Sequence, residues 1–284
     1  MTDRPVIALT GASGYVGGII AAALSDSASV VRLGRSGEIG WSFGEGGEAL
    51  IGALAAAKTT HLIHAAWDMH ASSLADQQRI SVDGSRKLLD AAKAAGVRRL
   101  IFISTISAFA GARSSYGRSK LAVERMFLDA GGIVLRLGLV HGGGTGGMLG
   151  TLRDAVRKGR FVPMIGRGTA PQYPLDATTL GEAVRRAVDG TLVETDAPIT
   201  LARRDPIAFR DLVLAIAAAE GRTVTPVPLP WPLLYAGLRS AEMLGVKLGV
   251  RSDSVVSFIF QNPAPDFGPM LANRIMPAAP DFAA

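Results

Sequence analysis

The chain has 284 residues, 48% of them hydrophobic and 19% charged, a length that fits one large α/β domain with or without a smaller appendage. It contains no cysteine, which excludes a disulfide framework, thiolate chemistry and sulfur-based metal sites, and we predict no bound metal ion. The basic residues behind the net charge of +6 are scattered and are not interleaved with aromatic side chains, so we expect no nucleic-acid partner.

Short apolar runs alternate with helical patterns along much of the chain. The N-terminal segment carries an acidic residue and only a short apolar run, which is not typical of a signal peptide, so the cytoplasm is the default location. Strands that alternate with helices form a parallel sheet covered on both faces, which predicts an α/β fold with a doubly wound sheet. The expected strands are 6–10, 30–33, 61–66, 100–104, 133–137 and 198–201, and the expected helices are 15–24, 82–95, 116–128 and 176–188.

The pattern changes beyond Gly138. The segment from His141 to Gly150 reads HGGGTGGMLG and predicts a loop, either a mobile one near a ligand or a disordered surface connection. From Asp205 on, helices and proline-rich connections dominate, without a second nucleotide-binding pattern. We therefore predict a nucleotide-binding domain at 1–138 and 175–201, and a small C-terminal substrate lobe at 139–174 and 202–284.

The segment from Pro228 to Val250 is rich in Leu, Trp and Tyr. Prolines and charged residues interrupt it, so it does not predict a membrane span, and we expect none elsewhere. We expect it to pack over a substrate cleft, and the alternative is a helix that meets a membrane surface or a partner protein.

Three glycines follow the first expected strand directly and open the first expected helix. Gly11, Gly14 and Gly17 are spaced so that the chain can reverse tightly, approach a pyrophosphate and pack its helix closely on the strand. The helix N-terminus then offers free N–H groups and a favourable dipole to an anion. This context favours a Rossmann-type dinucleotide site over a merely structural turn.

The end of the second expected strand bears on the choice between NAD and NADP. NAD-selective sites place an acid there for the ribose hydroxyls, whereas this chain reads Gly34-Arg35-Ser36 and has no acid before Glu38. An arginine can bind a 2′-phosphate through two N–H groups, and Ser36 can add a hydrogen bond. Arg32 is a second candidate, but it lies inside the strand. We predict NADP, with NAD as the alternative.

A phenol and an ammonium group lie four residues apart at Tyr116 and Lys120. On a helix this spacing places both on one face. A tyrosine with its usual pKa near 10 is a poor base at neutral pH, and a nearby lysine cation favours the phenolate. Thr105 ends the preceding buried strand and could hydrogen-bond the same oxygen. The pair could therefore exchange a proton with a carbinol or a ketone.

Together these segments resemble the extended branch of the short-chain dehydrogenase/reductase family, which holds nucleotide-sugar epimerases, dehydratases and reductases. The resemblance covers about the first 200 residues well and the rest loosely. It is carried by TGASGYVG at Thr10 to Gly17, HAAW at His64 to Trp67, the central helix from Val82 to Ala92, FISTISAF at Phe102 to Phe109, YGRSKLAVE at Tyr116 to Glu124, LRLGLVHGGG at Leu135 to Gly144 and PLDATTLGEAV near Asp176.

The resemblance implies roles for single residues. Tyr116 would donate or accept a proton, while Lys120 would lower its pKa and hold the nicotinamide ribose. Thr105 takes the place of the family's substrate-binding hydroxyl, with Ser107 as a weaker candidate, and His64 would line the cofactor through its backbone. The implied cofactor-binding set is Gly11, Ser13, Gly14, Tyr15, Val16, Gly17, Arg35, Ser36, His64, Ala65, Ala66, Lys120 and Leu139. Substrate contacts are weaker candidates: Arg167, Gln172, Tyr173, Arg203 and Arg204.

The chain departs from the family pattern in three places. It reads Ile80-Ser81-Val82-Asp83 where the family often has an asparagine, its connection from Thr105 to Tyr116 is short, and it lacks the usual acidic pair near adenine. A dehydratase is disfavoured because Ile106-Ser107 offers no acidic pair.

Three functions remain open. The first is an NADP-dependent reductase acting on a ketone of a nucleotide-sugar or a related polar carbonyl compound. The others are an epimerase with tightly bound cofactor and a non-catalytic NADP-binding scaffold or sensor. The resemblance also makes a homodimer a candidate assembly, formed through the helix that begins at Tyr116 and its neighbour.

Overall fold

A six-stranded parallel sheet forms the centre of the protein. The structure is a computed structural model that describes residues 4–69, 73–193, 195–246 and 250–282. The strand order is β10-β5-β4-β3-β1-β2, and every neighbouring pair is parallel. The strands are β1 (Val6–Thr10), β2 (Ser29–Leu33), β3 (His61–His64), β4 (Arg99–Thr105), β5 (Ile133–Leu137) and β10 (Ile199–Leu201).

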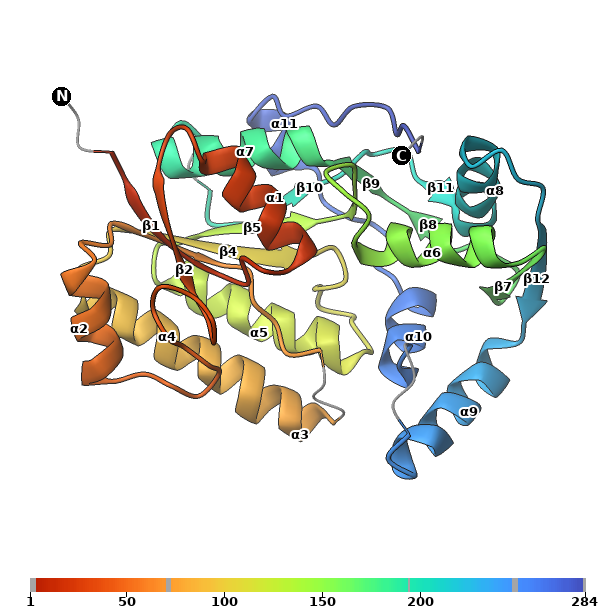
Figure 1. Cartoon of the computed structure of the whole chain (residues 1–284), viewed down its shortest axis with the longest axis horizontal. Coiled ribbons are helices and arrows are strands. Elements are labelled where there is room, and N and C mark those ends of the chain that lie inside the picture. Colours follow the sequence, from red (N-terminus) through yellow and green to blue (C-terminus); the bar gives the residue numbers. More distant parts are fainter. Residues whose placement is uncertain (1–3, 70–72, 194, 247–249, 283–284) are drawn as a thin grey trace.

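Helices cover both faces of this sheet (Figure 1). The helices α1, α7 and α11 pack on one face, and α2, α4 and α5 pack on the other, each with its own apolar core. The predicted doubly wound α/β fold is therefore confirmed. The bounds are α1 (Tyr15–Leu24), α2 (Glu48–Ala56), α4 (Asp83–Ala94), α5 (Ser115–Asp129), α7 (Ala177–Asp189) and α11 (Gly268–Ala272); α3 (Leu74–Asp76) and a π-helical segment (Gln77–Val82) precede α4.

The observed sheet agrees closely with the sequence-based prediction because its central strands are buried. In β1 and β4 all residues between the strand ends are buried, because helices lie above and below them, and such strands read as continuous apolar runs. Each expected strand and helix is present, with ends that differ by no more than one or two residues. The direction of winding reverses at β1, which lies between β2 and β3. In open α/β sheets ligands bind at such a reversal.

A smaller lobe with its own apolar core lies beside the sheet (Figure 1). Its centre is a parallel pair of strands, β7 and β12, packed against α6 and α8. Two short strand pairs, β6 with β9 and β8 with β11, connect the lobe to the sheet domain. The bounds are β6 (Leu139–His141), α6 (Gly147–Lys158), β7 (Phe161–Ile165), β8 (Pro171–Gln172), β9 (Pro174–Asp176), β11 (Ile207–Ala208), α8 (Phe209–Ala219), β12 (Thr225–Leu229), α9 (Trp231–Met243) and α10 (Ser252–Ile259).

The glycine-rich loop is shorter than the sequence predicts. The expectation of a loop from His141 to Gly150 is correct only for residues 142–146, because β6 includes His141 and α6 begins at Gly147. Gly150 lies inside α6, where a Cβ atom would come within 1.7 Å of the Thr145 carbonyl oxygen. The glycines at 147 and 150, which predicted a loop, instead belong to α6, and Gly150 allows that helix to pack closely on Thr145.

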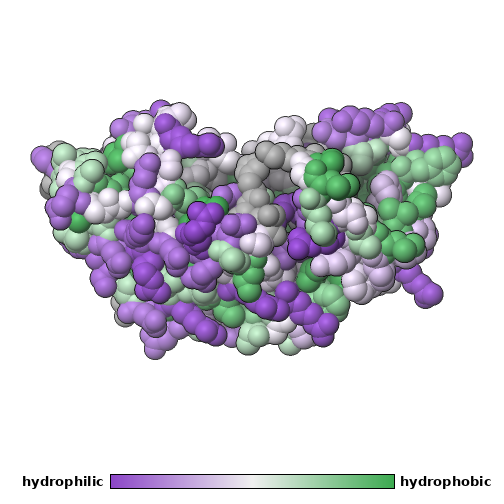
Figure 2. Space-filling model, turned by 90° about the horizontal axis from the view of Figure 1, so that it is seen from below, coloured by the Kyte–Doolittle hydropathy of each residue, from purple (hydrophilic) through white to green (hydrophobic). Residues whose placement is uncertain are grey.

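The apolar segment at 228–250 contains β12 residues and α9, and α9 packs against α10. Within α9 only Leu238 is buried, and Leu233 and Met243 are 71% and 78% exposed. Figure 2 shows apolar side chains on the right of the molecule, where α9 lies. Among the described residues, no helix combines the length and the apolar character needed to cross a membrane.

A buried ion pair joins α5 to the sheet. The Glu124 carboxylate is 1% exposed, and it accepts hydrogen bonds from the Arg136 guanidinium at 2.8 and 2.6 Å and from the Ser104 hydroxyl at 2.6 Å. One side chain of α5 therefore contacts both β4 and β5. Burying charges costs free energy, so this pair is stable only while both partners are present.

We predict that Arg136→Met lowers the free energy of unfolding by about 3–5 kcal/mol, because it leaves Glu124 buried without its cation. The exposed pair between Arg32 and Glu38 provides the matched control, and Arg32→Met should lower the free energy of unfolding far less, because solvent screens this pair. Urea unfolding monitored by circular dichroism measures both values. Equal losses in the two variants would contradict the prediction.

Candidate active site

The turn after β1 is too tight for side chains at two of its glycines. Gly11 has φ +73°, and a Cβ atom there would lie 2.7 Å from the amide nitrogen of Ala66 at the end of β3. A Cβ atom on Gly17 would lie 1.9 Å from the carbonyl oxygen of Gly11. The first contact brings β1 and β3 together, and the second presses α1 onto the turn. Glycine is therefore required at both positions for packing reasons.

The beginning of α1 fits a dinucleotide phosphate. Gly14 caps the helix without a side-chain hydrogen bond, so the free amides of the first turn, at Tyr15 and Val16, are left for an anion. Ser13 and Gly14 are exposed, and the nearest atom to a Cβ on Gly14 belongs to the turn itself. The backbone is therefore open on the side from which a pyrophosphate would approach.

His64 belongs to a buried hydrogen-bond relay. The Ser85 hydroxyl donates to the Ser81 carbonyl at 2.6 Å, so its oxygen accepts from His64 Nε2–H at 2.8 Å. His64 Nδ1 then accepts a hydrogen bond from the Thr10 hydroxyl at 2.7 Å. The Thr10 oxygen in turn accepts hydrogen bonds from the main-chain amides of Ala65 and Ala66, at 3.0 Å each. The imidazole is neutral and inside the protein, so only its neighbouring backbone faces the candidate site.

Arg35 and Ser36 are both exposed in the turn that follows β2. The Glu38 carboxylate is occupied: it accepts from the backbone amide and the guanidinium of Arg32 at 2.8 to 3.1 Å. These bonds lower the pKa of Glu38 to about 2, with the Arg32 side chain as the main cause. Among the described residues Arg35 has no ion-pair partner. It is thus the free cation at the end of β2.

Thr105, Tyr116 and Lys120 lie together at the end of β4 and the beginning of α5. Burial raises the pKa of Tyr116 to about 12, and a hydrogen bond with Thr105 acts in the opposite direction. Lys120 is 3% exposed and donates to the Ile103 carbonyl at 2.8 Å. Burial lowers the pKa of Lys120 to about 7, although the charge of Glu124 raises it. The lower phenol pKa expected from Lys120 is not seen here: burial is the main cause and raises the pKa, and the group that lowers it is Thr105.

Trp67 lies between the glycine turn after β1 and the predicted catalytic pair, Tyr116 and Lys120. It follows Ala66, and its ring lies edge-on to Tyr116 with centroids 6.0 Å apart. The Lys120 ammonium lies 4.2 Å from the centroid of the Trp67 ring, within the range of a cation–π interaction. Gly11 contacts Ala66, and Trp67 contacts Tyr116 and Lys120. The glycine turn and the Tyr116–Lys120 pair therefore lie in one continuous region.

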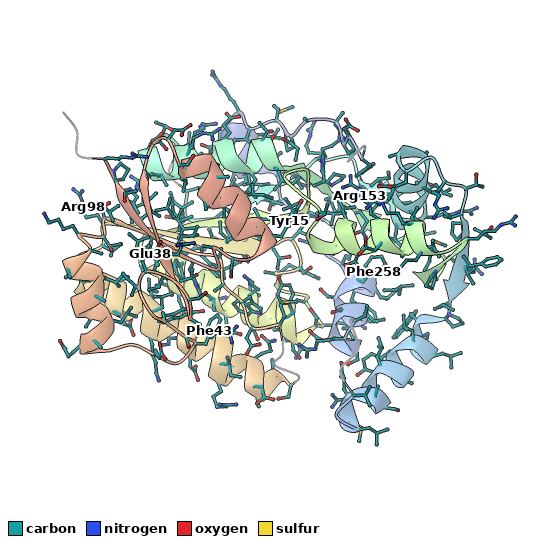
Figure 3. All side chains as sticks on the ribbon, viewed as in Figure 1. Tyr15, Glu38, Phe43, Arg98, Arg153 and Phe258 are labelled. Atoms are coloured by element: carbon teal, nitrogen blue, oxygen red, sulfur yellow. The ribbon has the colours of Figure 1, made fainter. Side chains whose placement is uncertain are left out.

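The 142–146 loop packs on the beginning of α1. The Tyr15 hydroxyl donates to the Gly142 carbonyl at 2.5 Å, and the Tyr15 ring would be 2.7 Å from a Cβ atom on Gly146. Figure 3 shows Tyr15 beside α6, near Arg153. Burial raises the pKa of Tyr15, and the positive charge of Arg153 lowers it. The loop therefore packs beside the predicted phosphate site, with residues 142–145 exposed.

The remaining sequence candidates lie in or near the lobe. Leu139 begins β6 and packs against the lobe core, while Gln172 is buried and donates to its own backbone neighbours, Ala170 and Pro171. Arg167 and Arg204 are exposed. The structure does not bring these residues into contact with Tyr116. Tyr173 packs beside Phe267, and Arg203 lies 3.9 Å from Asp205.

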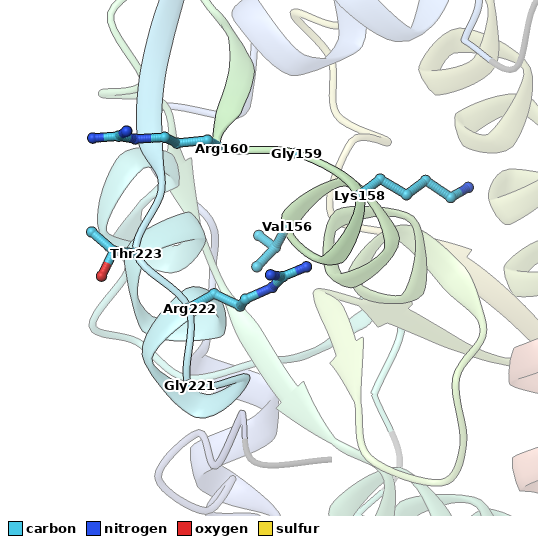
Figure 4. A pocket seen from close by; sticks show the side chains of 7 residues that line it. All are labelled: Val156, Lys158, Gly159, Arg160, Gly221, Arg222 and Thr223. Atoms are coloured by element: carbon cyan, nitrogen blue, oxygen red, sulfur yellow. The ribbon is translucent and has the colours of Figure 1, made fainter.

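Two hollows lie away from Tyr116. The first, about 330 Å³, is on the lobe between the ends of α6 and α8 (Figure 4). The second, about 400 Å³, lies between α1 and α7 and includes Gly143 of the loop. None of the three predicted catalytic residues lines either one. The first is lined by Val156, Lys158, Gly159, Arg160, Gly221, Arg222 and Thr223.

Comparison with known proteins agrees with this geometry. Residues 7–189 match the model of the NAD dependent epimerase/dehydratase family. The chain belongs to this family. The match covers the glycine turn, β4, α5 and α7. It confirms the resemblance to extended short-chain dehydrogenases/reductases, and it makes a nicotinamide dinucleotide the expected class of cofactor.

Similar proteins share the family's fold at low identity. The UDP-glucose 4-epimerase of Thermus thermophilus, in complex with NAD, is 20% identical with a TM-score of 0.66, covering 89% of this chain and 97% of that one. The dTDP-4-dehydrorhamnose reductase of Bacillus anthracis, in complex with NADP, is 13% identical with a TM-score of 0.68, covering 90% and 99%. Uncharacterized protein y4nL of Sinorhizobium fredii is 25% identical in an alignment that covers 83% of this chain and 79% of that protein.

Sequence reasoning assigned no role to three residues at this site. Trp67 and Glu124 both lie inside recognised motifs, and each had a local signal: Trp67 follows a strand end, and Glu124 is one helical turn beyond Lys120. Asp253 had none, because it contacts the beginning of α5 from 137 and 138 residues further along the chain.

We predict that NADPH binds at least about tenfold more tightly than NADH, because a charged contact from Arg35 to the 2′-phosphate is worth roughly 1.5–3 kcal/mol. Arg35→Ala should remove this preference. Arg98→Ala is the matched control, because Arg98 is exposed at the opposite end of the sheet (Figure 3). Fluorescence titration measures the affinities. Equal binding of the two cofactors by the unmodified protein would contradict the prediction.

We also predict that His64 makes stability depend on pH. Burial lowers its pKa to about 3 from 6.5, and the charge of Lys120 contributes. As the pH falls below about 6.5 the unfolded chain gains a proton that the folded protein does not bind, so the free energy of unfolding falls by up to about 1.4 kcal/mol per pH unit from this group. His64→Gln should flatten the slope between pH 6.5 and 4. An NMR titration that shows the His64 ring protonating near pH 6.5 in the folded protein would refute this.

Proposed function

We propose that this protein is an NADP-dependent reductase of a ketone, carried by a nucleotide-sugar or a related polar carbonyl compound. The observation that carries the proposal is the state of Tyr116. Burial raises the pKa of its phenol to about 12, so the phenol is protonated at neutral pH, and Thr105 at the end of β4 hydrogen-bonds it. A protonated phenol at this position suits a group that donates a proton to a carbonyl oxygen.

The chain's own residues would hold the cofactor at the switch point between β1 and β3. The first-turn amides of α1 would bind the pyrophosphate, and Arg35 with Ser36 would bind the 2′-phosphate. Ala65 and Ala66, fixed by the Thr10 hydroxyl, would provide a flat backbone surface beside it. A bound NADPH supplies the hydride.

Tyr116 would donate its proton to the carbonyl oxygen as that oxygen becomes an alkoxide. The Thr105 hydroxyl would orient the same oxygen by a hydrogen bond. Lys120 would then return a proton toward the phenolate, because a pKa of about 7 leaves it able to give or take a proton at neutral pH. General acid assistance of this kind contributes roughly 10² to 10⁴ in rate.

The exposed Arg35 favours reduction over epimerisation, because an arginine at this position suits NADP, which cells keep reduced. The short connection from Thr105 to Tyr116 would leave room for the cofactor to exchange.

The substrate class follows from the family and from the lobe. Two similar structures are enzymes named for UDP-glucose and dTDP-4-dehydrorhamnose, which favours a nucleotide-linked keto-sugar. We propose that residues 1–138 and 175–201 bind the cofactor, and that residues 139–174 and 202–284 bind the substrate. The homodimer formed through α5 and its neighbour stays a prediction.

The decisive experiment measures redox stoichiometry. A reductase oxidises one NADPH for each product, so the absorbance of the reduced nicotinamide falls until a limiting dTDP-4-keto-sugar is consumed. An epimerase returns its hydride and leaves the cofactor unchanged. We expect net oxidation of NADPH and cofactor that exchanges readily on dilution. Purified protein that retains stoichiometric cofactor and isomerises substrate without net redox change would instead establish the epimerase, and no turnover of either kind would favour the scaffold.

Tyr116→Phe provides the matched variant for this assay. It removes one hydroxyl and keeps the ring packed against Trp67, so NADPH binding should stay nearly unchanged while kcat falls by about 10² to 10⁴. Near-normal kcat in this variant would exclude Tyr116 as the acid.

A further inference from the structure

The first turn of α5 is completed from the far end of the sequence. The Asp253 carboxylate accepts the main-chain amides of Ser115 at 2.7 Å and of Tyr116 at 3.0 Å. The Ser114 side chain accepts the next amide, that of Gly117, at 3.1 Å. The amides that a helix leaves unpaired in its first turn are therefore satisfied, and a charged group satisfies two of them.

Asp253 is itself fixed by the helix pair α9 and α10. The neighbouring residue, Ser252, donates from its amide at 2.9 Å and from its hydroxyl at 2.7 Å to the Glu242 carboxylate near the end of α9. On the other side, the Arg251 guanidinium donates to the Met69 carbonyl at 2.9 Å. Residues 251–253 thus contact α9, the segment after Trp67 and the beginning of α5. Figure 1 shows α10 beside the beginning of α5.

This arrangement gives Asp253 control over the backbone at Ser115 and Tyr116. Its carboxylate binds the amide of Tyr116 itself, so any movement of α10 moves the Cα atom from which the phenol projects. A carboxylate at a helix N-terminus is also favoured by the helix dipole, which holds it in place. Displacement of a reacting group by about 1 Å can cost 10²-fold in rate.

We propose that Asp253 is a positioning residue for Tyr116, through which the α9–α10 pair of the lobe sets the place of the proton donor. The catalytic half of this inference rests on the proposed role of Tyr116. Asp253 does not touch the reacting atoms. It acts through the backbone of α5, and Glu242 acts one step further away, through Ser252.

The test uses the full chain and combines two measurements. Hydrogen exchange, followed by mass spectrometry on the peptide that spans 114–120, reports directly on the first turn of α5. Steady-state kinetics with NADPH and a dTDP-4-keto-sugar give kcat, KM and the solvent isotope effect. The variants are Asp253→Ala, Asp253→Asn as the milder change should Ala fail to fold, and Glu242→Ala. Ser254→Ala is the matched control, because Ser254 is exposed on the same helix and its amide bonds to the Arg251 carbonyl instead of to α5.

We expect Asp253→Ala to accelerate exchange in this peptide, to lower kcat by about 10²-fold and to raise the solvent isotope effect, while NADPH affinity stays the same. Glu242→Ala should change exchange and kcat in the same direction by less, although its side chain does not touch α5. Ser254→Ala should change neither.

Two results would overturn the inference. One is unchanged exchange in Asp253→Ala, which would mean that the carboxylate does not hold the helix. The other is faster exchange with unchanged kcat and isotope effect, which would mean that the contact is structural only. If the unmodified protein reduces no ketone, the proposed function fails, and the exchange measurements alone still decide whether Asp253 and Glu242 hold the beginning of α5.

Discussion

The Thr10 hydroxyl joins the C-terminal ends of β1 and β3, and the candidate site depends on that junction. Its oxygen accepts two consecutive amides at the end of β3, and its proton goes to His64, whose other nitrogen bonds Ser85 of α4. Because the two strand ends are held level, Gly11 can approach Ala66 to the distance at which a side chain no longer fits. This junction requires a neutral histidine in the core. Burial lowers the pKa of His64, and it lowers the pKa of Lys120 in the same way.

Burial governs the protonation of Tyr116 and Lys120 more than their mutual charges do. Tyr116 and Lys120 lie one turn apart, yet burial favours the neutral form of both side chains. It raises the pKa of the phenol and lowers the pKa of the ammonium group. Glu124 opposes this change at Lys120, and it is itself neutralised by Arg136. The charge on Lys120 is therefore balanced against the Glu124 carboxylate, whose own partner Arg136 lies in the sheet. The protonation of the candidate site is thus tied to the packing of α5 on β4 and β5.

Local patterns in the sequence predicted the parts of the fold that local forces determine. Buried strands such as β4 are continuous apolar runs, and the glycine turn has a spacing that packing requires, so both could be predicted. The strand β12 could not, because its residues alternate with prolines and pair only with β7, which is distant in sequence. The same limit applies within the site. The spacing of Tyr116 and Lys120 could be recognised in the sequence, but the pKa of the phenol depends on the residues that bury it. The Asp253 contact could not be predicted, because it spans more than a hundred residues.

The turn after β2 also protects the sheet from other chains. β2 is an edge strand, and an edge exposes amide and carbonyl groups that can pair with a strand of another molecule. Here the chain folds back so that the Ile39 amide donates to the Arg32 carbonyl and the Glu38 carboxylate accepts the Arg32 amide. Both backbone groups of that edge residue are consumed within the chain, beside a charged pair. The few residues that leave Arg35 exposed for a ligand therefore also act against aggregation through this edge.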